Sequence, residues 1–353
     1  MTRKQNINRG LNAQRGYAAI GIIAAVGITA TTLLVTSLSA TALRNQQDRK
    51  TTAALAIAKQ ALIGYAASHT NSGGQVKPGW LPCPDTDNDG SADSPCGATG
   101  TTAIGRLPWK TLGLPDVRDG SGECLWYVVS ANFKNSGTSA PATINASSLG
   151  TLTVKNNAGA TIVPPTSVVA IVFAPGSALP GQDRPTAGNP VCGGNMSATA
   201  YLDTVSGINN ATGNGLSTFI AGDRSDTFND QLLYITTQQL FSVVNKRVLM
   251  ELRGATSGTA TGLMKYYVDN FSTYPWAASA DGNQVVNQPS GGFPYNDTSV
   301  TNTISSSTLG WLNSNGWFSS MNYSVQQTPP QVQLSIGTSS IPVCPNASSG
   351  SCP

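Results

Sequence analysis

The hydrophobic pattern is strongest near the N-terminus of the chain. From Tyr17 to Leu43 there is no charged residue, and Ala, Ile, Leu and Val predominate. A helix that crosses the hydrocarbon core of a bilayer needs about 20 mostly apolar residues. The pattern therefore predicts a membrane-spanning helix over residues 17–43.

The helical pattern resumes after a short polar stretch. Leu55, Ala58, Leu62 and Tyr65 are three or four positions apart and so lie on one side of a helix. We therefore expect one long N-terminal helix over residues 17–68, apolar on all sides at first and amphipathic afterwards. A folded head is expected to follow it.

Short elements are predicted in the rest of the chain. Strands are expected where β-branched and aromatic residues stand between Gly, Pro and Asn. These strands are Leu125–Ser130, Thr151–Lys155, Ser167–Ala174, Leu232–Thr236 and Val332–Ile336. Apolar spacing predicts helices over Thr237–Leu252 and Leu263–Phe271, and residues 177–226 resemble long surface loops. We divide the head into a first region, 69–236, and a second, 237–353.

The composition indicates an extracellular protein. Only 10% of the 353 residues are charged, whereas about 25% is usual in globular proteins. Ser, Thr, Asn and Gly are abundant instead, as in β-rich proteins that hydroxyl and amide groups keep soluble. The formal net charge is +3, but residues 1–16 hold four cations and no acid. The basic balance thus belongs to the N-terminal segment and gives no support for nucleic-acid binding.

The N-terminal junction carries a resemblance to a known family. Arg3, Lys4, Arg9 and Arg15 precede Gly16, and the aromatic Tyr17 opens the apolar stretch. Basic residues on this side hold an N-terminus in the cytoplasm. Over residues 9–66 the chain resembles type IV pilins and the pseudopilins of type II secretion. The resemblance implies a leader, residues 1–16, that a prepilin peptidase removes between Gly16 and Tyr17, and methylation of the new amino group.

One position departs from the family pattern. Most pilins have Glu five residues into the mature chain, where this sequence has Gly21. Large K-type pseudopilins, which sit at a filament tip, also lack this Glu. The resemblance therefore implies a minor or tip subunit. It would be a structural protein and not an enzyme.

The family resemblance also implies a fold and a location. The fold would be α+β, a pilin-like long N-terminal helix that carries a large, β-rich, loop-rich and disulfide-bonded head. The chain would pass once through the inner membrane with its N-terminus in the cytoplasm. Its head would lie in the periplasm or on an extracellular filament, and other pilin or pseudopilin subunits would bind through the N-terminal helix.

Two alternatives to a filament subunit stay open. The N-terminal helix could be a simple anchor for a cell-surface binding protein or adhesin. It could also be a secretory signal, because Ala40-Thr41-Ala42 has the small residues that signal peptidase prefers and cleavage there would leave Leu43 at the N-terminus. Nor does the resemblance distinguish a pilus from a secretion pseudopilus.

The head could be a duplicated pilin-like unit. Leu107-Pro108-Trp109 in the first region has a counterpart in Phe293-Pro294-Tyr295, and Trp126 has one in Trp317. The spacing between these landmarks differs in the two regions. Chance recurrence in a chain rich in Gly and Pro is the alternative, and the sequence does not decide between them.

The cysteines predict disulfide bonds. An even number of cysteines in an exported chain favours them. The six are Cys83, Cys96, Cys124, Cys192, Cys344 and Cys352. Loop closure favours the near pairs 83–96 and 344–352, which leaves 124–192. Free buried thiols are the alternative, and a zinc site has little support because no C-x-x-C occurs and His69 is the single histidine.

An acidic loop is the best local motif. Asp85, Asp87, Asp89 and Asp93 alternate with other residues around Gly90, and Ser91 adds a hydroxyl oxygen. Calcium binds six to eight oxygen ligands, and alternate Asp residues in a tight loop can direct theirs to one point. The sequence predicts a Ca²⁺ site here, with a solvated turn as the alternative.

Catalysis has little support. The chain has only two glutamates, and His69 has no obvious nucleophile or acid nearby in the sequence. No phosphate-binding loop or G-x-S-x-G motif is present. Arg106 and Glu123 are expected to form an ion pair beside Trp109 and Trp126 in the core, with a carbohydrate- or partner-binding face as the alternative.

Overall fold

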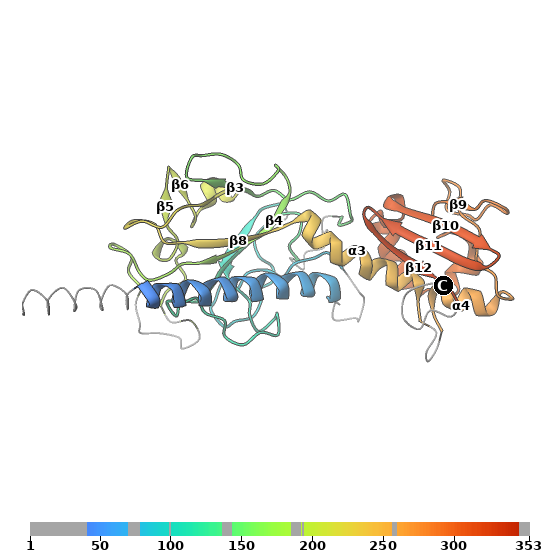
Figure 1. Cartoon of the computed structure of the whole chain (residues 1–353), viewed down its shortest axis with the longest axis horizontal. Helices are drawn as coiled ribbons and strands as arrows, with labels where there is room; N and C mark the ends of the chain where they lie inside the picture. Colours follow the sequence, from blue (N-terminus) through green and yellow to red (C-terminus); the bar gives the residue numbers. More distant parts are fainter. Residues whose placement is uncertain are drawn as a thin grey trace, which may run out of the picture. The chain divides into compact units, whose positions relative to one another are not determined.

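The computed structural model describes residues 41–69, 78–98, 100–135, 143–184, 192, 194–255 and 260–345 (Figure 1). The described part is α+β with a β-rich body. Residues 51–353 form one compact unit and residues 1–50 another. The larger unit contains two four-stranded antiparallel sheets, β1-β2-β4-β8 and β9-β10-β11-β12.

The predicted membrane-spanning helix is wrong for this structure. In the ranges given above, no helix is both long enough and apolar enough to cross a membrane. Residues 41–50 are helical, but charged side chains occur there from Arg44 to Lys50. Most of the predicted span 17–43, and the Gly16–Tyr17 junction, lie outside the described residues.

The first sheet confirms three of the predicted strands. Its strands are β1 (Ala103–Arg106), β2 (Trp126–Val129), β4 (Val168–Ala174) and β8 (Gln231–Thr236). The last three were expected from their apolar, β-branched runs. β1 was not expected, because Gly105 and Arg106 make it resemble a loop.

Both faces of the first sheet are buried, which explains its continuous apolar strands. Along β2, Tyr127 and Val129 pack in the cluster that contains one side of the helix over residues 51–68. Trp126 and Val128 point to the opposite face and pack in a second cluster. This division follows because successive side chains along a strand point to opposite faces of the sheet.

A layer of short elements covers this second face. It contains β3 (Thr153–Asn156), η1 (Ala198–Ala200), β5 (Thr204–Val205), β6 (Ile208–Asn209), α2 (Gly213–Leu216) and β7 (Thr218–Ala221). β3, which was predicted, pairs in parallel with β7. The expectation of loops over residues 177–226 is therefore only partly right. Elements of two to four residues carry too little periodicity to be found in a sequence.

The second sheet shows strict alternation. Its strands are β9 (Ser290–Gly291), β10 (Met321–Gln327), β11 (Pro330–Ile336) and β12 (Ser339–Val343). In β10, Met321, Tyr323 and Val325 are buried and the residues between them are exposed. One face of this sheet is therefore in the core, and the other faces solvent.

Helices cover the buried face of the second sheet. α3 (Thr237–Arg253) was predicted almost to the residue, and α4 (Gly262–Asp269) follows it. Thr236 and Gln239 form a capping box at the start of α3, which fixes that end. The shorter helices are α5 (Thr298–Thr301), α6 (Ser306–Ser314) and η2 (Trp317–Ser320).

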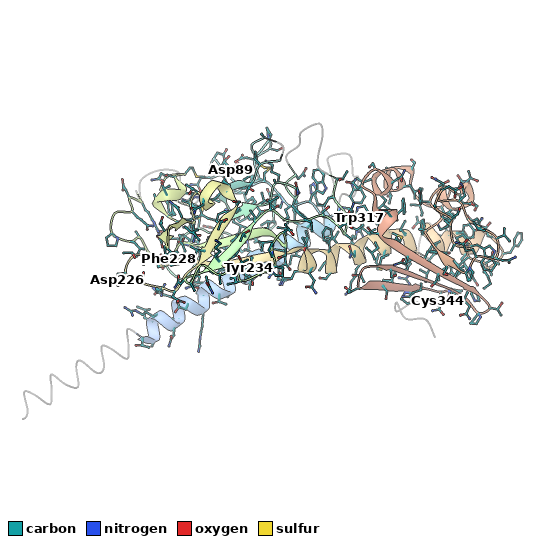
Figure 2. All side chains as sticks on the ribbon, turned by 90° about the horizontal axis from the view of Figure 1, so that it is seen from above. Asp89, Asp226, Phe228, Tyr234, Trp317 and Cys344 are labelled. Carbon is teal, nitrogen blue, oxygen red and sulfur yellow. A yellow bond between two sulfur atoms is a disulfide. The ribbon has the colours of Figure 1, made fainter. Side chains whose placement is uncertain are left out.

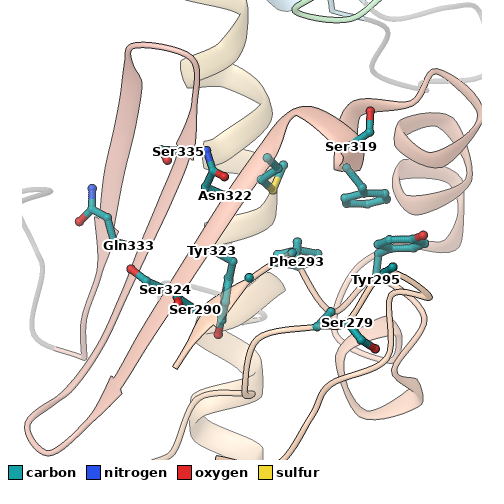
Figure 3. Close-up of a pocket in the computed structure, with 16 residues that line it drawn as sticks. Ser279, Ser290, Phe293, Tyr295, Ser319, Asn322, Tyr323, Ser324, Gln333 and Ser335 are labelled. Atoms are coloured by element: carbon teal, nitrogen blue, oxygen red, sulfur yellow. The ribbon is translucent and has the colours of Figure 1, made fainter. Parts of the chain in front are cut away.

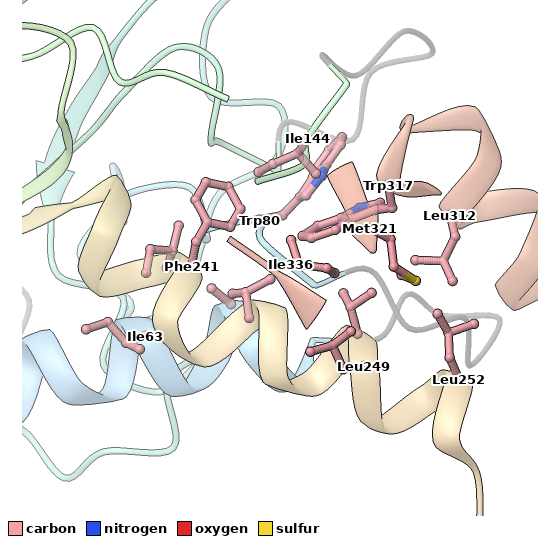
Figure 4. Packing of buried hydrophobic residues seen from close by; sticks show 14 of the residues in the cluster. Ile63, Trp80, Ile144, Phe241, Leu249, Leu252, Leu312, Trp317, Met321 and Ile336 are labelled. Carbon is pink, nitrogen blue, oxygen red and sulfur yellow. The ribbon is translucent and has the colours of Figure 1, made fainter. Parts of the chain in front are cut away.

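The core next to α3 is assembled from distant parts of the sequence. Figure 4 shows Leu249 and Leu252 of α3 together with Leu312 of α6 and with Trp317 and Ile336. Each of these side chains is at most 1% exposed. Burying a side chain of this size contributes about 1.5–3 kcal/mol, so this contact is a main source of the second region's stability.

The two sheets share an arrangement. Each is an antiparallel series in which the strands follow chain order. Gly105 of β1 pairs with Tyr127 of β2, and Gly291 of β9 pairs with Tyr323 of β10. These pairs give a register with which positions in the two sheets can be compared.

Candidate functional site: the acidic loop

The acidic loop, residues 85–93, is fixed at its base. Cys83 and Cys96 form a disulfide with their Cα atoms 5.7 Å apart. The backbones of Asp85 and Arg106 exchange two hydrogen bonds, of 2.8 and 3.0 Å. The loop is therefore attached to the first sheet through β1.

Asp85 organises the turn from inside. It is fully buried, and its carboxylate accepts hydrogen bonds from the backbone amides of Asn88 at 2.7 Å, Gly90 at 2.8 Å and Asp87 at 3.2 Å. Such bonds are what Asp contributes to turns in general. A structural role for Asp85 is thus present whether or not an ion binds.

Three of the predicted ligands lie together. Asp85, Asp87 and Asp89 each place one carboxylate oxygen within 4.8 Å of the others. Asp87 and Asp89 are exposed, and Figure 2 shows Asp89 at the surface. A cation from solvent could therefore reach these oxygens.

The other two predicted ligands are used differently. A carboxylate oxygen of Asp93 accepts hydrogen bonds from the hydroxyl of Thr86, at 2.6 Å, and from its backbone amide. Asp93 does not belong to the group of three. Ser91 donates its backbone amide to Asp89 at 2.6 Å. The structure thus brings together three of the five predicted residues.

Burial and charge act together on Asp85. Burial raises the pKa of its carboxyl group, the three amide hydrogen bonds partly offset this, and the negative charge of Asp87 raises the pKa further. Negative groups this close disfavour one another's ionisation. A bound cation would remove that repulsion.

Two residues near the loop were not predicted. Asn88 is 4% exposed, and its Oδ1 is buried with no hydrogen-bond partner in the described part of the chain. Its φ of 67° is one that Asn tolerates better than most residues, so the N-D-G run was the available signal. Lys110 donates its ammonium to the carbonyl oxygen of Asp89 and lies 5.3 Å from the centre of the Trp109 ring.

Gly90 shows why the loop needs glycine. Its φ is +86°, and a Cβ atom there would lie 2.7 Å from the Trp109 ring. Both the backbone conformation and the ring exclude a larger residue. Trp109 therefore supports the loop from the side of the first sheet.

The donor set fits calcium better than a softer metal. Asp85, Asp87 and Asp89 supply carboxylate oxygens, and the buried amide oxygen of Asn88 has no hydrogen-bond partner among the described residues. Calcium prefers oxygen ligands of this kind. A second group, Asp116 with Cys124 and Cys192, does not fit a metal, because its two sulfurs are joined in a disulfide.

The prediction of disulfide bonds is confirmed for five of the cysteines. Besides Cys83–Cys96, the structure contains Cys124–Cys192, with Cα atoms 5.7 Å apart. Cys344 is also disulfide-bonded. Cys352 lies outside the described residues.

The remaining candidate groups have local partners. His69 stacks on Tyr65 with ring centres 4.5 Å apart and hydrogen-bonds Asn135 at 2.9 Å. Glu123 pairs with Arg184 at 3.2 Å, so the predicted pair with Arg106 is wrong. These contacts give each group a structural role.

Comparison with known proteins finds no matching family model, no matching curated protein and no matching solved structure.

Proposed function

We propose that this chain is a structural, non-enzymatic subunit of a pilin-like filament, either a type IV pilus or a type II secretion pseudopilus. A prepilin peptidase would cut between Gly16 and Tyr17, and the segment after Tyr17 would bind other pilin or pseudopilin subunits. The head would lie outside the cytoplasm, stabilised by calcium. Gly21 stands where most pilins have Glu, which favours a minor or tip position in the filament.

The observation that carries this proposal is how the helix over residues 51–68 joins the head. Ala58, Leu62 and Ala66 form a fully buried stripe in the main core cluster. The hydroxyl of Thr51 accepts a hydrogen bond from the amide of Gly120 at 2.9 Å. The helix is thus fixed along its length, as a subunit that carries mechanical load requires.

Polar contacts strengthen the same connection. The ammonium of Lys59 donates to the carbonyl oxygen of Tyr234 and to the side chain of Gln239, each at 2.9 Å. Tyr234 belongs to β8 and Gln239 to α3, so one lysine joins the helix to the end of the first sheet and to the start of the second region. A pulling force on the helix would therefore act on both the first sheet and the second region.

The disulfides support export. Disulfides persist in oxidising compartments such as the periplasm and are rare in the cytosol. Cys83–Cys96 and Cys124–Cys192 close loops in a body with few charged residues. The composition and the disulfides therefore favour the same location.

Sheared surface filaments test the proposal. We expect antibodies to detect the chain in filaments sheared from cells of its natural host. The Gly16→Glu variant should stay in the cell fraction, because it changes the glycine at the cleavage site. Gly10→Glu, a leader glycine away from the junction, should leave the yield in filaments unchanged. Equal recovery of both variants in filaments would contradict the proposal.

A surface binding protein or adhesin is the second candidate function. The observation that favours it is an open, polar groove on the second sheet, whereas the matching face of the first sheet is buried.

A further inference from the structure

The solvent-facing side of the second sheet carries a cluster of uncharged polar side chains. Asn322 of β10 pairs with Ser335 of β11, and Ser324 pairs with Gln333 on one side and with Ser290 of β9 on the other. Paired residues in adjacent strands point to the same face. The five side chains therefore form one surface, which we call the polar face.

The same positions in the first sheet are apolar. The register places Trp126 and Val128 where β10 has Asn322 and Ser324. It also places Ile171 and Phe173 of β4 where β11 has Gln333 and Ser335. The first sheet's residues are at most 1% exposed beneath the layer of short elements, whereas the polar face has no such cover within the described residues.

A glycine keeps the polar face open. Gly292 and Arg106 occupy matching positions in the two sheets. Gly292 follows Gly291, which pairs with Tyr323, and Arg106 follows Gly105, which pairs with Tyr127. In the first sheet the Arg106 guanidinium fills this space, 4.9 Å from the centre of the Trp126 ring and 4.5 Å from that of Tyr201. Gly292 has no side chain to fill the corresponding space, and Ala278 provides the atoms nearest to a Cβ there, at 3.8 and 4.0 Å.

The result is a groove of about 640 Å³ (Figure 3). The polar face forms one wall, and the opposite side contains Phe293, Tyr295 and Phe318. Tyr295 and Phe318 stack 4.5 Å apart at 5°, and Phe318 stacks on Phe293 at 5.6 Å and 7°. Phe293 is fully buried and Phe318 is 7% exposed, so the stack closes this side of the groove, and Tyr295 is the ring of the three that is only half-buried.

The chemistry of the lining restricts the ligand. All the lining residues are uncharged. In the described part of the chain, Asn322, Ser324, Gln333 and Ser335 make no side-chain hydrogen bond, so their donors and acceptors are available. The volume lies in the range of small-molecule sites. Hydroxyl and amide groups suit a ligand that has many hydroxyl groups and no charge.

We infer that this groove binds a neutral oligosaccharide. Acidic sugars and phosphorylated ligands are disfavoured, because no cation in the groove would offset the cost of removing their charge from water. Apolar ligands are disfavoured because they would cover the polar face without satisfying it. The inference does not depend on cleavage at Gly16 or on filament assembly.

Binding of the full-length purified protein to a panel of oligosaccharides tests the inference. The panel pairs neutral oligosaccharides with acidic ones of similar length, and titration calorimetry measures affinity. Gly292→Arg should abolish binding, because it places in the groove the side chain that fills the first sheet. Gly292→Ala is the matched control, since the nearest atom to a Cβ there is 3.8 Å away. It should bind like the parent.

A second pair of variants does not rely on filling the groove. The double variant Asn322→Ala with Gln333→Ala should weaken binding by about tenfold or more, because hydrogen bonds to the ligand are lost. Asn313→Ala, an exposed position of α6 outside the groove, should leave affinity unchanged. Thermal melting of each variant verifies that it is folded.

Three outcomes would overturn the inference. One is that no neutral oligosaccharide binds. Another is that folded Gly292→Arg binds as well as the parent. The third is a concentration-dependent dimer in sedimentation that Gly292→Arg abolishes, which would identify a second copy of this chain as the occupant.

Discussion

The hydroxyl of Tyr323 donates a hydrogen bond to the carbonyl oxygen of Pro275, with the two atoms 2.7 Å apart. Tyr127 makes the same contact with Pro82 at 3.2 Å. Both tyrosines are at most 1% exposed and stand at matching positions in the second strand of their sheets. Each bond ties the loop that leads into a sheet to the sheet's own centre.

Removing either hydroxyl should therefore destabilise the fold. Burial raises the pKa of Tyr323, so its hydroxyl stays protonated and able to donate. Tyr323→Phe leaves the Pro275 carbonyl oxygen without this donor, and we expect a loss of about 1–3 kcal/mol in the free energy of unfolding. Tyr234→Phe, on a half-buried residue of β8, should cost less. Urea unfolding measures both, and equal values would contradict a role for the bond.

Calcium should raise the melting temperature of the purified protein. Binding to the folded state alone stabilises by about 2.7 kcal/mol at 100 times the dissociation constant. Extracellular sites often have dissociation constants of about 10⁻⁴–10⁻³ M, so the titration must reach millimolar calcium. Asp89→Asn should remove the effect of calcium.

Asp281→Asn is the matched control for the calcium experiment. Asp281 precedes Gly282 as Asp89 precedes Gly90, and both glycines pack against an aromatic ring. However, the residues just before Asp281 include Ala278 and Ser279, whereas those before Asp89 include the carboxylates Asp85 and Asp87. Its loss should leave the calcium response intact. If calcium leaves the melting curve of the parent protein unchanged, the acidic loop is a solvated turn and not a calcium site.

Asp230 should make stability depend on pH. It is 4% exposed, and its Oδ1 has no hydrogen-bond partner among the described residues. Its other oxygen accepts from the amide of Asp203 at 2.8 Å and from the side chain of Asn210 at 3.0 Å. Burial, and secondly the charge of Asp203, raise the pKa of Asp230 well above its usual value.

The sign of the effect follows from that direction. The folded state holds a proton that the unfolded chain releases above its own pKa of about 4, so this group's contribution falls as pH rises through the folded-state pKa. Asp230→Asn removes the charge and should raise stability above that point by on the order of 1–2 kcal/mol. Denaturant unfolding from about pH 5 to pH 8 tests this. If the variant lost stability with pH as steeply as the parent, Asp230 would not be the cause; Asp226→Asn, at an exposed carboxylate, controls for net charge.

Reduction should loosen the acidic loop first. Cys83 and Cys96 are 13 positions apart, and closing a loop of about 15 residues contributes on the order of 3 kcal/mol in the entropic account. The Cys83→Ser and Cys96→Ser double variant should therefore melt lower and bind calcium more weakly. Non-reducing peptide mapping of exported protein should show all six cysteines oxidised, and a free Cys83 would contradict the prediction.

The sequence predicted those elements whose own residues determine them. β4 and β8 contain apolar runs, β11 alternates Val332, Leu334 and Ile336 with polar residues, and α3 has both a periodic apolar face and a capping box at Thr236. β10 was missed because Val325 is the single β-branched residue among its alternating apolar positions, and β9 because two residues carry no pattern. Those strands are defined by their partners, which a single sequence does not reveal.

The acidic loop was predicted in part for the same reason. Alternation in a short loop brings Asp85, Asp87 and Asp89 together by covalent geometry alone. Asp93 instead turns to Thr86, a local hydrogen bond that competes with metal binding. Asn88 was overlooked because its burial depends on the packing of the loop against the first sheet.

The mass of the mature chain tests the central claim most directly. Protein extracted from cells of the natural host should begin at Tyr17 and carry one added methyl group on its amino terminus, as a processed pilin-like subunit would. Intact-mass and N-terminal peptide spectrometry give this result in one experiment. A chain that begins at Leu43, or one that retains residues 1–16, would contradict the assignment to a pilin-like filament.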